Sequence, residues 1–506
     1  MQLGVLLAGL PVVAVRGDLD VEVRGIAHDS RQVKPGDLFV CIPGYQHDGH
    51  QYISEAYRRG AVVAVTERQV EASCHVLVPD SRQALAHLAS VFYGNPSARL
   101  RLIGITGTNG KTTTAHMLYH ILQHAGRDTG LLGTICYRIG QEEERSHQTT
   151  PDALWLTQIL ARLAGRGARY AVMEVSSHGL ALKRVAGCCF HAAVFTNITR
   201  DHFDFHRDFE DYLAAKCLLF RNLATPGPGQ HAPYAVVNCD DPNWMRVASQ
   251  TRARVITCGT SPGAWLRAEH VGRVAPNGFE LVAPGLRLPI SLAMPGKHNV
   301  DNALAAAAVA LEEGVDPVHV AGALARVTVP GRWECVDRGQ PFRVVVDFAH
   351  NPAALERMLQ SAGGNGGRTL LVFGCEGGKD SGKRPLMGTI AGLWSHHAII
   401  TSDNCPREDP GEVARQVRAG LNGHVCAEII LDRRLAIGRA LELARPGDTV
   451  VVAGKGHETH QYMGEQKWPF DDRVVIEELL EALGYHARPR RQAGAPELPC
   501  QDAGGR

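Results

Sequence analysis

The sequence has no long apolar run, no pair of cysteines at C-x-x-C spacing and no excess of charge of either sign. Its 53 lysine and arginine residues nearly cancel its 52 aspartate and glutamate residues, which leaves a formal net charge of +1. This balance gives no electrostatic footprint for nucleic acid or for an anionic membrane. No apolar run approaches the length that spans a bilayer. We therefore expect small-molecule partners, with no nucleic acid and no membrane.

The cysteines argue against a zinc protein or a dithiol redox protein, and the N-terminal residues argue against a signal peptide. The 13 cysteines include no C-x-x-C spacing, which argues against a zinc site or a redox dithiol and favours free thiols in a reducing cytoplasm. Residues 1–15 are apolar but lack a basic segment and contain Gly9 and Pro11. They predict an opening helix and strand instead of a signal peptide. We expect a cytoplasmic chain that acts as a monomer.

A glycine-rich segment is the most informative feature that is present. It follows an apolar run, 102–106, that predicts a buried strand, and it precedes a helical pattern at 114–124. Backbone N–H groups and a helix N-terminus in this context bind phosphates, Lys111 can reach the β- and γ-phosphates, and Thr112 can ligate Mg²⁺. The loop is a shortened variant, since Ile105 stands where the usual pattern has glycine. The predicted site for ATP or GTP comprises Gly107, Thr108, Asn109, Gly110, Lys111, Thr112 and Thr113.

The chain has enough apolar residues, 44%, for several packed cores. Apolar runs that alternate with helical segments predict α/β domains with mostly parallel sheets. The predicted domains are a small α/β domain at 1–96, a central P-loop domain at 97–327, a doubly wound Rossmann-like domain at 328–488 and a disordered tail at 489–506. The predicted strands lie at 170–175, 192–196, 234–238, 255–258, 343–346, 369–373, 398–401, 428–431 and 449–453, and a predicted loop lies at 225–233.

Polar side chains follow two of the predicted strands of the central domain. Glu174 and Ser176 end one strand, and Asn197 and His202 follow the next. Ligands of open α/β sheets bind at strand ends, and carboxylate and imidazole could hold a nucleotide-associated Mg²⁺. Each of these residues could equally cap a helix or satisfy a loop, so metal binding and a structural role both stay open.

Eight segments carry a resemblance to a known family, the Mur ligases, which use ATP to join amino acids onto a UDP-muramoyl precursor of peptidoglycan. The resemblance runs from about residue 25 to about 462 and is strongest to the type that adds the third residue. The segments are DSRQVKPGDLFV (29–40), GTNGKTTT (107–114), TTPDA (149–153), MEVSSHGL (173–180), TNITRDHFDFH (196–206), DYLAAK (211–216), GKRPLMG (382–388) and AGKGHE (453–458).

The resemblance implies a role for residues in all three domains. Lys111, His202 and Lys216 are implied to be catalytic, and Lys216 is implied to be carbamylated, which turns a cation into a carboxylate. Thr112, Glu174, His202 and Lys216 are implied to hold Mg²⁺. Asn299, Asn302, Arg332 and Asp347 are implied to contact ATP. The residues implied to bind the UDP-linked acceptor or the incoming amino acid are Ser30, Thr149, Thr150, Ser176, Arg184, Arg384, Asp403, Asn404, Arg407, Gly454 and Glu458.

The implied reaction joins a free diamino acid to the D-Glu side chain of UDP-N-acetylmuramoyl-L-Ala-D-Glu through an acyl phosphate. Fixed positive charge suits both steps, and the division of substrates among domains implies closure. Members that add meso-diaminopimelate carry Asp-Asn-Pro-Arg, whereas this chain has Asp-Asn-Cys-Pro-Arg at 403–407. Other departures are Asn351, His298 and the segment 377–380. L-lysine, L-ornithine or a paralogous acceptor therefore stay open beside meso-diaminopimelate.

Two alternatives lie outside this assignment. A folylpolyglutamate or cyanophycin synthetase would share the central and third domains, but the motifs at 29–40 belong to the UDP-binding region of the muramoyl-adding type. A nucleotide-dependent switch or scaffold would share the phosphate loop alone. Intact Lys111, Glu174, His202 and Lys216 argue against a switch.

Overall fold

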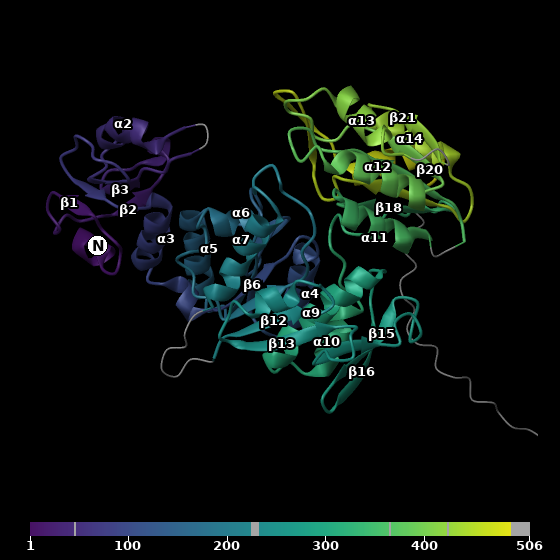
Figure 1. Cartoon of the computed structure of the whole chain (residues 1–506), viewed down its shortest axis with the longest axis horizontal. Helices are drawn as coiled ribbons and strands as arrows, with labels where there is room; N and C mark the ends of the chain where they lie inside the picture. The colour runs from purple at the N-terminus through teal and green to yellow at the C-terminus, as the bar shows by residue number, and fades with distance from the viewer. Residues whose placement is uncertain (45–46, 224–231, 364–365, 422–424, 487–506) are drawn as a thin grey trace, which may run out of the picture. The chain divides into compact units, whose positions relative to one another are not determined.

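The computed structural model describes residues 1–44, 47–223, 232–363, 366–421 and 425–486. The chain divides into two compact units, Met1–Pro330 and Gly331–Arg506 (Figure 1). The predicted tail and most of the predicted loop at 225–233 lie outside the described residues. No described helix is long and apolar enough to cross a membrane.

The first unit begins with a five-stranded sheet in the order β1-β5-β4-β3-β2. The predicted opening helix and strand are present as α1 and β1. Helix α3 packs its apolar face on this sheet, and its first turn is capped by Asp80, whose carboxylate accepts from the N–H of Gln83. The elements are α1 Leu3–Leu7, β1 Ala14–Arg16, β2 Gly25–Ala27, β3 Asp37–Val40, α2 Ile53–Arg58, β4 Val63–Thr66, β5 His75–Leu77 and α3 Ser81–Phe92.

An eleven-stranded sheet forms the rest of the first unit, in the order β16-β15-β14-β13-β12-β11-β6-β10-β7-β8-β9. The strands from β14 to β7 pair in parallel, and antiparallel strands flank them on both sides. Helices α4, α9 and α10 pack on one face, and α5 and α7 pack on the other. The predicted mostly parallel central sheet is therefore confirmed.

The elements of this part of the chain follow one another as strands and covering helices. They are β6 Arg101–Thr106, α4 Lys111–His124, β7 Thr129–Leu132, β8 Cys136–Ile139, β9 Glu142–Arg145, α5 Ala153–Gly165, β10 Tyr170–Glu174, α6 Ser177–Ala181, β11 Ala192–Phe195, α7 Phe209–Arg221, β12 Tyr234–Asn238, α8 Trp244–Ala248, β13 Arg254–Gly259, β14 Leu266–Glu269, β15 Gly278–Ala283, β16 Leu286–Ser291, α9 Lys297–Glu312 and α10 Pro317–Leu324.

The second unit contains a six-stranded sheet in the order β17-β18-β22-β19-β20-β21. Five of its strands are parallel. Helices α11, α12 and α13 cover one face, and α14 and α15 cover the other, as a doubly wound fold requires. Its elements are β17 Glu334–Cys335, β18 Arg343–Asp347, α11 Pro352–Ala362, β19 Thr369–Phe373, α12 Lys383–Trp394, β20 His397–Ile400, α13 Pro410–Arg418, β21 Cys426–Ile429, α14 Arg433–Leu443, β22 Thr449–Ala453, β23 His460–Met463, β24 Gln466–Pro469 and α15 Asp472–Ala482.

Candidate functional site

The glycine-rich loop joins the end of β6 to the start of α4. Helix α4 begins at Lys111, three residues before the predicted start, so the residues Lys111 to Thr113 form its first turn. Gly107 and Gly110 have φ of +152° and +86°, and a Cβ on Gly110 would lie 2.2 Å from Oδ1 of Asn302. Glycine is therefore required on steric grounds, and the first-turn N–H groups face the end of the loop as a phosphate site needs.

Two lysines donate to the same carbonyl oxygen of the loop, that of Gly107. Nζ of Lys111 donates to the carbonyl oxygens of Gly107 at 2.9 Å and Thr108 at 2.8 Å. Nζ of Lys216, from α7, donates to the same Gly107 oxygen at 2.8 Å. Lys216 is fully buried, and burial together with the charge of Lys111 lowers its pKa well below the usual value. The structure therefore brings the two predicted catalytic lysines together.

Glu174, the last residue of β10, faces the same loop. Its carboxylate accepts from Oγ1 of Thr112 at 2.8 Å, from the N–H of Thr134 at 2.7 Å and from Oγ1 of Thr134 at 3.0 Å. The side chain is buried. Two of the predicted Mg²⁺ ligands, Thr112 and Glu174, thus lie in direct contact, and both offer the oxygen atoms that Mg²⁺ prefers.

His202 has a left-handed backbone, with φ of +58°. Burial lowers its pKa to about 3, Lys111 and Lys216 act in the same direction, and Asp201 opposes them. The ring is therefore neutral near pH 7, the form in which imidazole binds metals. An unmodified Lys216 ammonium cannot bind a cation, whereas a carbamate at this position would fit the set of donors.

The two predicted asparagines lie on α9. Oδ1 of Asn302 accepts from Oγ1 of Thr114 at 3.3 Å, and its Nδ2 donates to Oδ1 of Asn299 at 3.3 Å. Nδ2 of Asn299 donates to the Pro295 carbonyl at 2.7 Å. The start of α9 is therefore held against the start of α4, beside the phosphate loop.

Three of the predicted acceptor-binding residues form one cluster. Oγ1 of Thr150 lies 3.1 Å from Oγ of Ser176, and Arg184 donates to the Thr150 carbonyl at 2.9 Å. Thr149 lies near Glu174, because its Oγ1 is 3.1 Å from Oγ1 of Thr134, which bonds to the Glu174 carboxylate. Ser30 lies apart, in the short 3-10 helix Ser30–Gln32 between β2 and β3, where the residue is buried and its hydroxyl donates to Glu55 at 3.2 Å.

Arg332 and Asp347 belong to the second unit. The Arg332 guanidinium lies 4.4 Å from the Phe348 ring centroid. Asp347 accepts from the N–H groups of Trp333 at 2.7 Å and Ala349 at 2.9 Å. Burial raises the pKa of Asp347 despite the opposing charge of Arg332. Both residues therefore lie at the end of β18, the edge where parallel α/β sheets bind ligands.

Four of the predicted amino-acid-binding residues gather at the ends of β20 and β22. Nδ2 of Asn404 donates to Glu458 at 2.9 Å. Gly454 has φ of +111°, and a Cβ there would lie 2.6 Å from Oδ2 of Asp403. Buried Lys455 donates to Oδ1 of Asn404 at 3.2 Å and to Glu458 at 2.9 Å. This edge therefore presents fixed amide and carboxylate groups.

The two predicted arginines are placed differently. Arg384 is buried and donates to Glu408 at 2.5 Å and to Gln416 at 2.7 Å. Arg407 is exposed and makes no hydrogen bond or ion pair with any described residue. Within the described residues, neither guanidinium therefore donates a hydrogen bond to Asp403, Asn404 or Glu458, and Arg384 is paired with Glu408 instead.

Some residues of this region were not predicted. Thr134 donates to Glu174, and Lys455 donates to Oδ1 of Asn404. Asn197, which the sequence analysis places at a strand end, accepts from the loop N–H groups of Thr108 and Asn109. Glu376, just after β19, also faces this region: burial, together with Asp403 and Glu458, raises its pKa to about 7. Asn197 and Lys455 lie inside the shared motifs, which was the available signal for both. Thr134 and Glu376 needed the tertiary structure.

Comparisons with known proteins agree over most of the chain. Three family profiles match: "Mur ligase family, catalytic domain" at 22–93, "Mur ligase middle domain" at 105–310 and "Mur ligase, glutamate ligase domain" at 331–456. A UDP-N-acetylmuramoyl-L-alanyl-D-glutamate--2,6-diaminopimelate ligase of Syntrophomonas wolfei is 44% identical over 95% of this chain and 99% of its own. A protein of the same name from Solibacter usitatus is 43% identical over 96% and 99%.

Solved structures with a similar fold include a ligase of the same name as these relatives. A structure of a UDP-N-acetylmuramoyl-L-alanyl-D-glutamate--2,6-diaminopimelate ligase is 28% identical, has a TM-score of 0.66, and is matched over 96% of this chain and 99% of its own. A folylpolyglutamate synthase of Mycobacterium tuberculosis, complexed with ADP and AMPPCP, has a TM-score of 0.60 but is 20% identical and covers 74% of this chain and 92% of its own. The second likeness concerns the fold alone. The chain belongs to the Mur ligase family.

Proposed function

We propose that this chain is an ATP-dependent, ADP-producing ligase that adds meso-diaminopimelate to the D-Glu side-chain carboxylate of UDP-N-acetylmuramoyl-L-Ala-D-Glu in peptidoglycan biosynthesis. The observation that carries the proposal is the 44% identity with a relative of that name over 99% of its length. The proposal includes a cytoplasmic location and action as a monomer.

ATP binds at the loop that connects β6 and α4. The first turn of α4 and Lys111 hold the phosphates, and Asn299 and Asn302 flank the nucleotide. Thr112, Glu174, His202 and carbamylated Lys216 would hold Mg²⁺. When bound, Mg²⁺ neutralises charge on the phosphates. Arg332 and Asp347 contact the nucleotide from the second unit.

The chemistry proceeds in two balanced steps. An oxygen of the D-Glu carboxylate attacks the γ-phosphorus of ATP, the bond to the β–γ bridging oxygen breaks, and ADP leaves. The uncharged amine of the amino acid then attacks the acyl carbon, inorganic phosphate leaves with the former carboxylate oxygen, and the amine loses a proton. Lys111 and Arg332 supply fixed positive charge where negative charge develops.

Lys216 is carbamylated in the proposed enzyme. Its complete burial favours the neutral amine, which adds to carbon dioxide and releases a proton to give a carbamate. The modification replaces the amine that donates to the Gly107 carbonyl with an anionic group that can bind a cation. The cluster of Thr150, Ser176 and Arg184 binds the acceptor, with Ser30 and Thr149.

The amino acid binds at the ends of β20 and β22, where Asp403, Asn404, Gly454 and Glu458 meet. The carboxylates suit an ammonium group, and an arginine suits a distal carboxylate. Arg384 and Arg407 are proposed to serve the latter role. L-lysine and L-ornithine are the alternatives, because Arg407 is displaced by one residue in the segment 403–407.

The test is phosphate release by the purified protein with ATP, Mg²⁺ and UDP-N-acetylmuramoyl-L-Ala-D-Glu. Meso-diaminopimelate, L-lysine and L-ornithine are offered in separate reactions, and the product mass is determined. Release with meso-diaminopimelate alone supports the proposal. Release with another amino acid moves the specificity, and no release with any of the three contradicts the proposal.

A further inference from the structure

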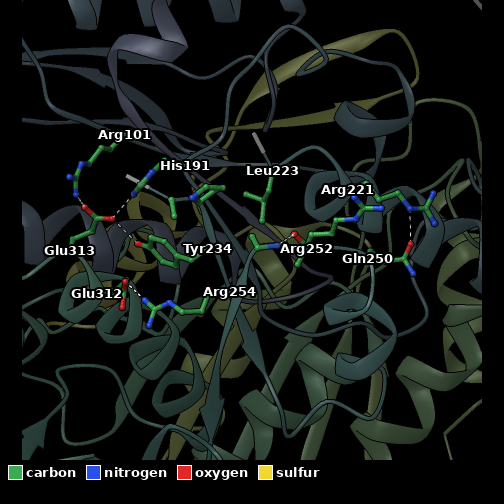
Figure 2. A pocket seen from close by; sticks show the side chains of 14 residues that line it. Arg101, His191, Arg221, Leu223, Tyr234, Gln250, Arg252, Arg254, Glu312 and Glu313 are labelled. Carbon is green, nitrogen blue, oxygen red and sulfur yellow. Dashed lines mark hydrogen bonds and ion pairs between the residues drawn. The ribbon is translucent and has the colours of Figure 1, made fainter. Parts of the chain in front are cut away.

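A cavity of about 840 Å³ opens where parallel strands of the central sheet begin (Figure 2). Arg101, Tyr234 and Arg254 are the first residues of β6, β12 and β13, and all three line it. The phosphate loop follows the opposite end of β6, a strand of six residues that spans about 20 Å. The cavity is therefore distinct from the proposed ATP site.

One carboxylate in the cavity wall, that of Glu313, accepts four hydrogen bonds from neighbouring side chains. Glu313 is buried and accepts from Arg101, from Nε2 of His191 at 3.0 Å, and from the hydroxyls of Tyr170 at 3.1 Å and Tyr234 at 2.9 Å. Burial alone would raise its pKa, but the bonds from His191 and Arg101 hold the pKa at about 2. Its charge is thus compensated within the wall, and the network fixes the Arg101 side of the cavity.

The second carboxylate of the wall, Glu312, is paired with Arg254. Two further arginines, Arg221 and Arg252, keep N–H groups that can donate to a ligand. Nε of Arg221 donates to Oε1 of Gln250 at 2.7 Å, and within the described part of the chain its side chain has no other hydrogen bond. The exposed Arg252 makes no hydrogen bond or ion pair with any described residue. Figure 2 shows Arg221, Gln250 and Arg252 in one part of the view and the Glu313 network in another.

The wall therefore holds four guanidinium groups against two carboxylates that are already paired. We propose that this cavity binds a small molecule that carries a phosphate or diphosphate group. Planar guanidinium forks match phosphate oxygens in a bidentate manner, and a concave basic surface concentrates anions. The volume lies in the range of small-molecule sites, about 300–1,000 Å³, and Leu223 and Pro233 can contact an organic portion.

The experiment is a calorimetric titration of inorganic pyrophosphate into the full-length protein, with and without excess ADP. The phosphate loop accounts for any binding that ADP displaces. The proposed acceptor site can also bind a diphosphate, so the cavity is measured by the part of the persisting binding that the double arginine variant loses. We expect one ADP-insensitive site, and at least a tenfold weaker affinity in the Arg221→Gln/Arg252→Gln variant. Both arginines are exposed, and thermal melting checks that the variant folds.

The matched control is Arg166→Gln, which removes an exposed arginine that pairs with Glu142 elsewhere in the same unit and should leave pyrophosphate affinity unchanged. The absence of ADP-insensitive binding, or wild-type affinity in the double variant, overturns the proposal. Citrate is the carboxylate probe, and tighter binding of citrate than of pyrophosphate overturns the assignment to a phosphate. These outcomes do not depend on whether the chain is a ligase.

Discussion

Lys216 carries the sharpest prediction at the scale of single residues. Lys216→Ala removes the proposed carbamate from a fully buried position beside Lys111. We expect ligation to be abolished, and high bicarbonate not to rescue it, because no amine remains to be modified. Phosphate release in the presence of acceptor and amino acid measures the effect.

The control for this variant is Lys467→Ala, which removes an exposed lysine over the Tyr462 ring. It should retain wild-type turnover. Thermal melting separates lost chemistry from lost folding, since Ala at position 216 also leaves a cavity. Near-normal turnover by a folded Lys216→Ala protein would rule out the assigned role.

Glu376 makes stability depend on pH in a defined direction. Burial and the neighbouring carboxylates raise its pKa from 4.5 to about 7. Between these values the folded protein holds a proton that the unfolded chain has lost, so the contribution of Glu376 to stability falls as pH rises. The free energy of unfolding of wild type relative to Glu376→Gln should therefore decline from about pH 4.5 to about pH 7 and stay level above it.

Urea unfolding of both proteins across this range measures the difference. Comparison with Glu376→Gln removes the contributions of the other titrating groups, which the two chains share. A difference that is constant with pH, or one that grows in favour of wild type as pH rises, would contradict the raised pKa.

At the scale of elements, the turn between β6 and α4 requires glycine. Ala at Gly110 would combine positive φ with a Cβ 2.2 Å from Oδ1 of Asn302. We expect Gly110→Ala to lose most of the thermal stabilisation that ADP and Mg²⁺ give to the wild-type protein. Gly126→Ala is the matched control at the other end of α4, where φ is +71° and nothing lies within 4 Å. It should lose about 1 kcal/mol of stability and keep the response to ADP.

A buried ion pair holds together the strand ends that carry the proposed amino-acid site. Arg433 and Asp472, each 0% exposed, form two hydrogen bonds of 2.8 Å. Arg433 also donates to the carbonyls of Ala453 at 2.9 Å and Ser402 at 3.5 Å, directly before Gly454 and Asp403. Arg433 is thus placed to position the ends of β22 and β20.

Arg433→Lys should raise KM for the amino acid about tenfold or more, because small misplacements of positioning groups are costly, with KM for ATP little changed. Arg368→Lys is the control, since Arg368 pairs with Asp448 at the opposite edge of the same sheet. Both changes should lower stability, but only the first should change KM for the amino acid. Equal KM values in the two variants would assign Arg433 a purely structural role.

At the scale of the whole molecule, the sequence predicts buried strands better than edge strands. The runs at 102–106 and 369–373 are apolar because both faces of their sheets are covered, and both strands are found. Strand β9 is Glu142–Arg145, a charged segment at a sheet edge that Arg162 and Arg166 pair with. It carries no apolar pattern and was not predicted.

The residues of the candidate site also differ in how well the sequence predicts them. The phosphate loop was recognisable because glycines, lysine and threonine are adjacent in sequence. The contacts of Thr134 with Glu174 and of Lys216 with Gly107 join residues from distant segments, so no local pattern announces them. The implied roles of the site residues remain predictions that the variants above address.

In the proposed reaction, ATP activates the acceptor carboxylate as an acyl phosphate. The most direct measurement uses acceptor labelled with ¹⁸O in the D-Glu side-chain carboxylate and determines the mass of the phosphate released during ligation. An acyl phosphate predicts that each phosphate carries one acceptor oxygen. Unlabelled phosphate accompanied by amide product would contradict the mechanism.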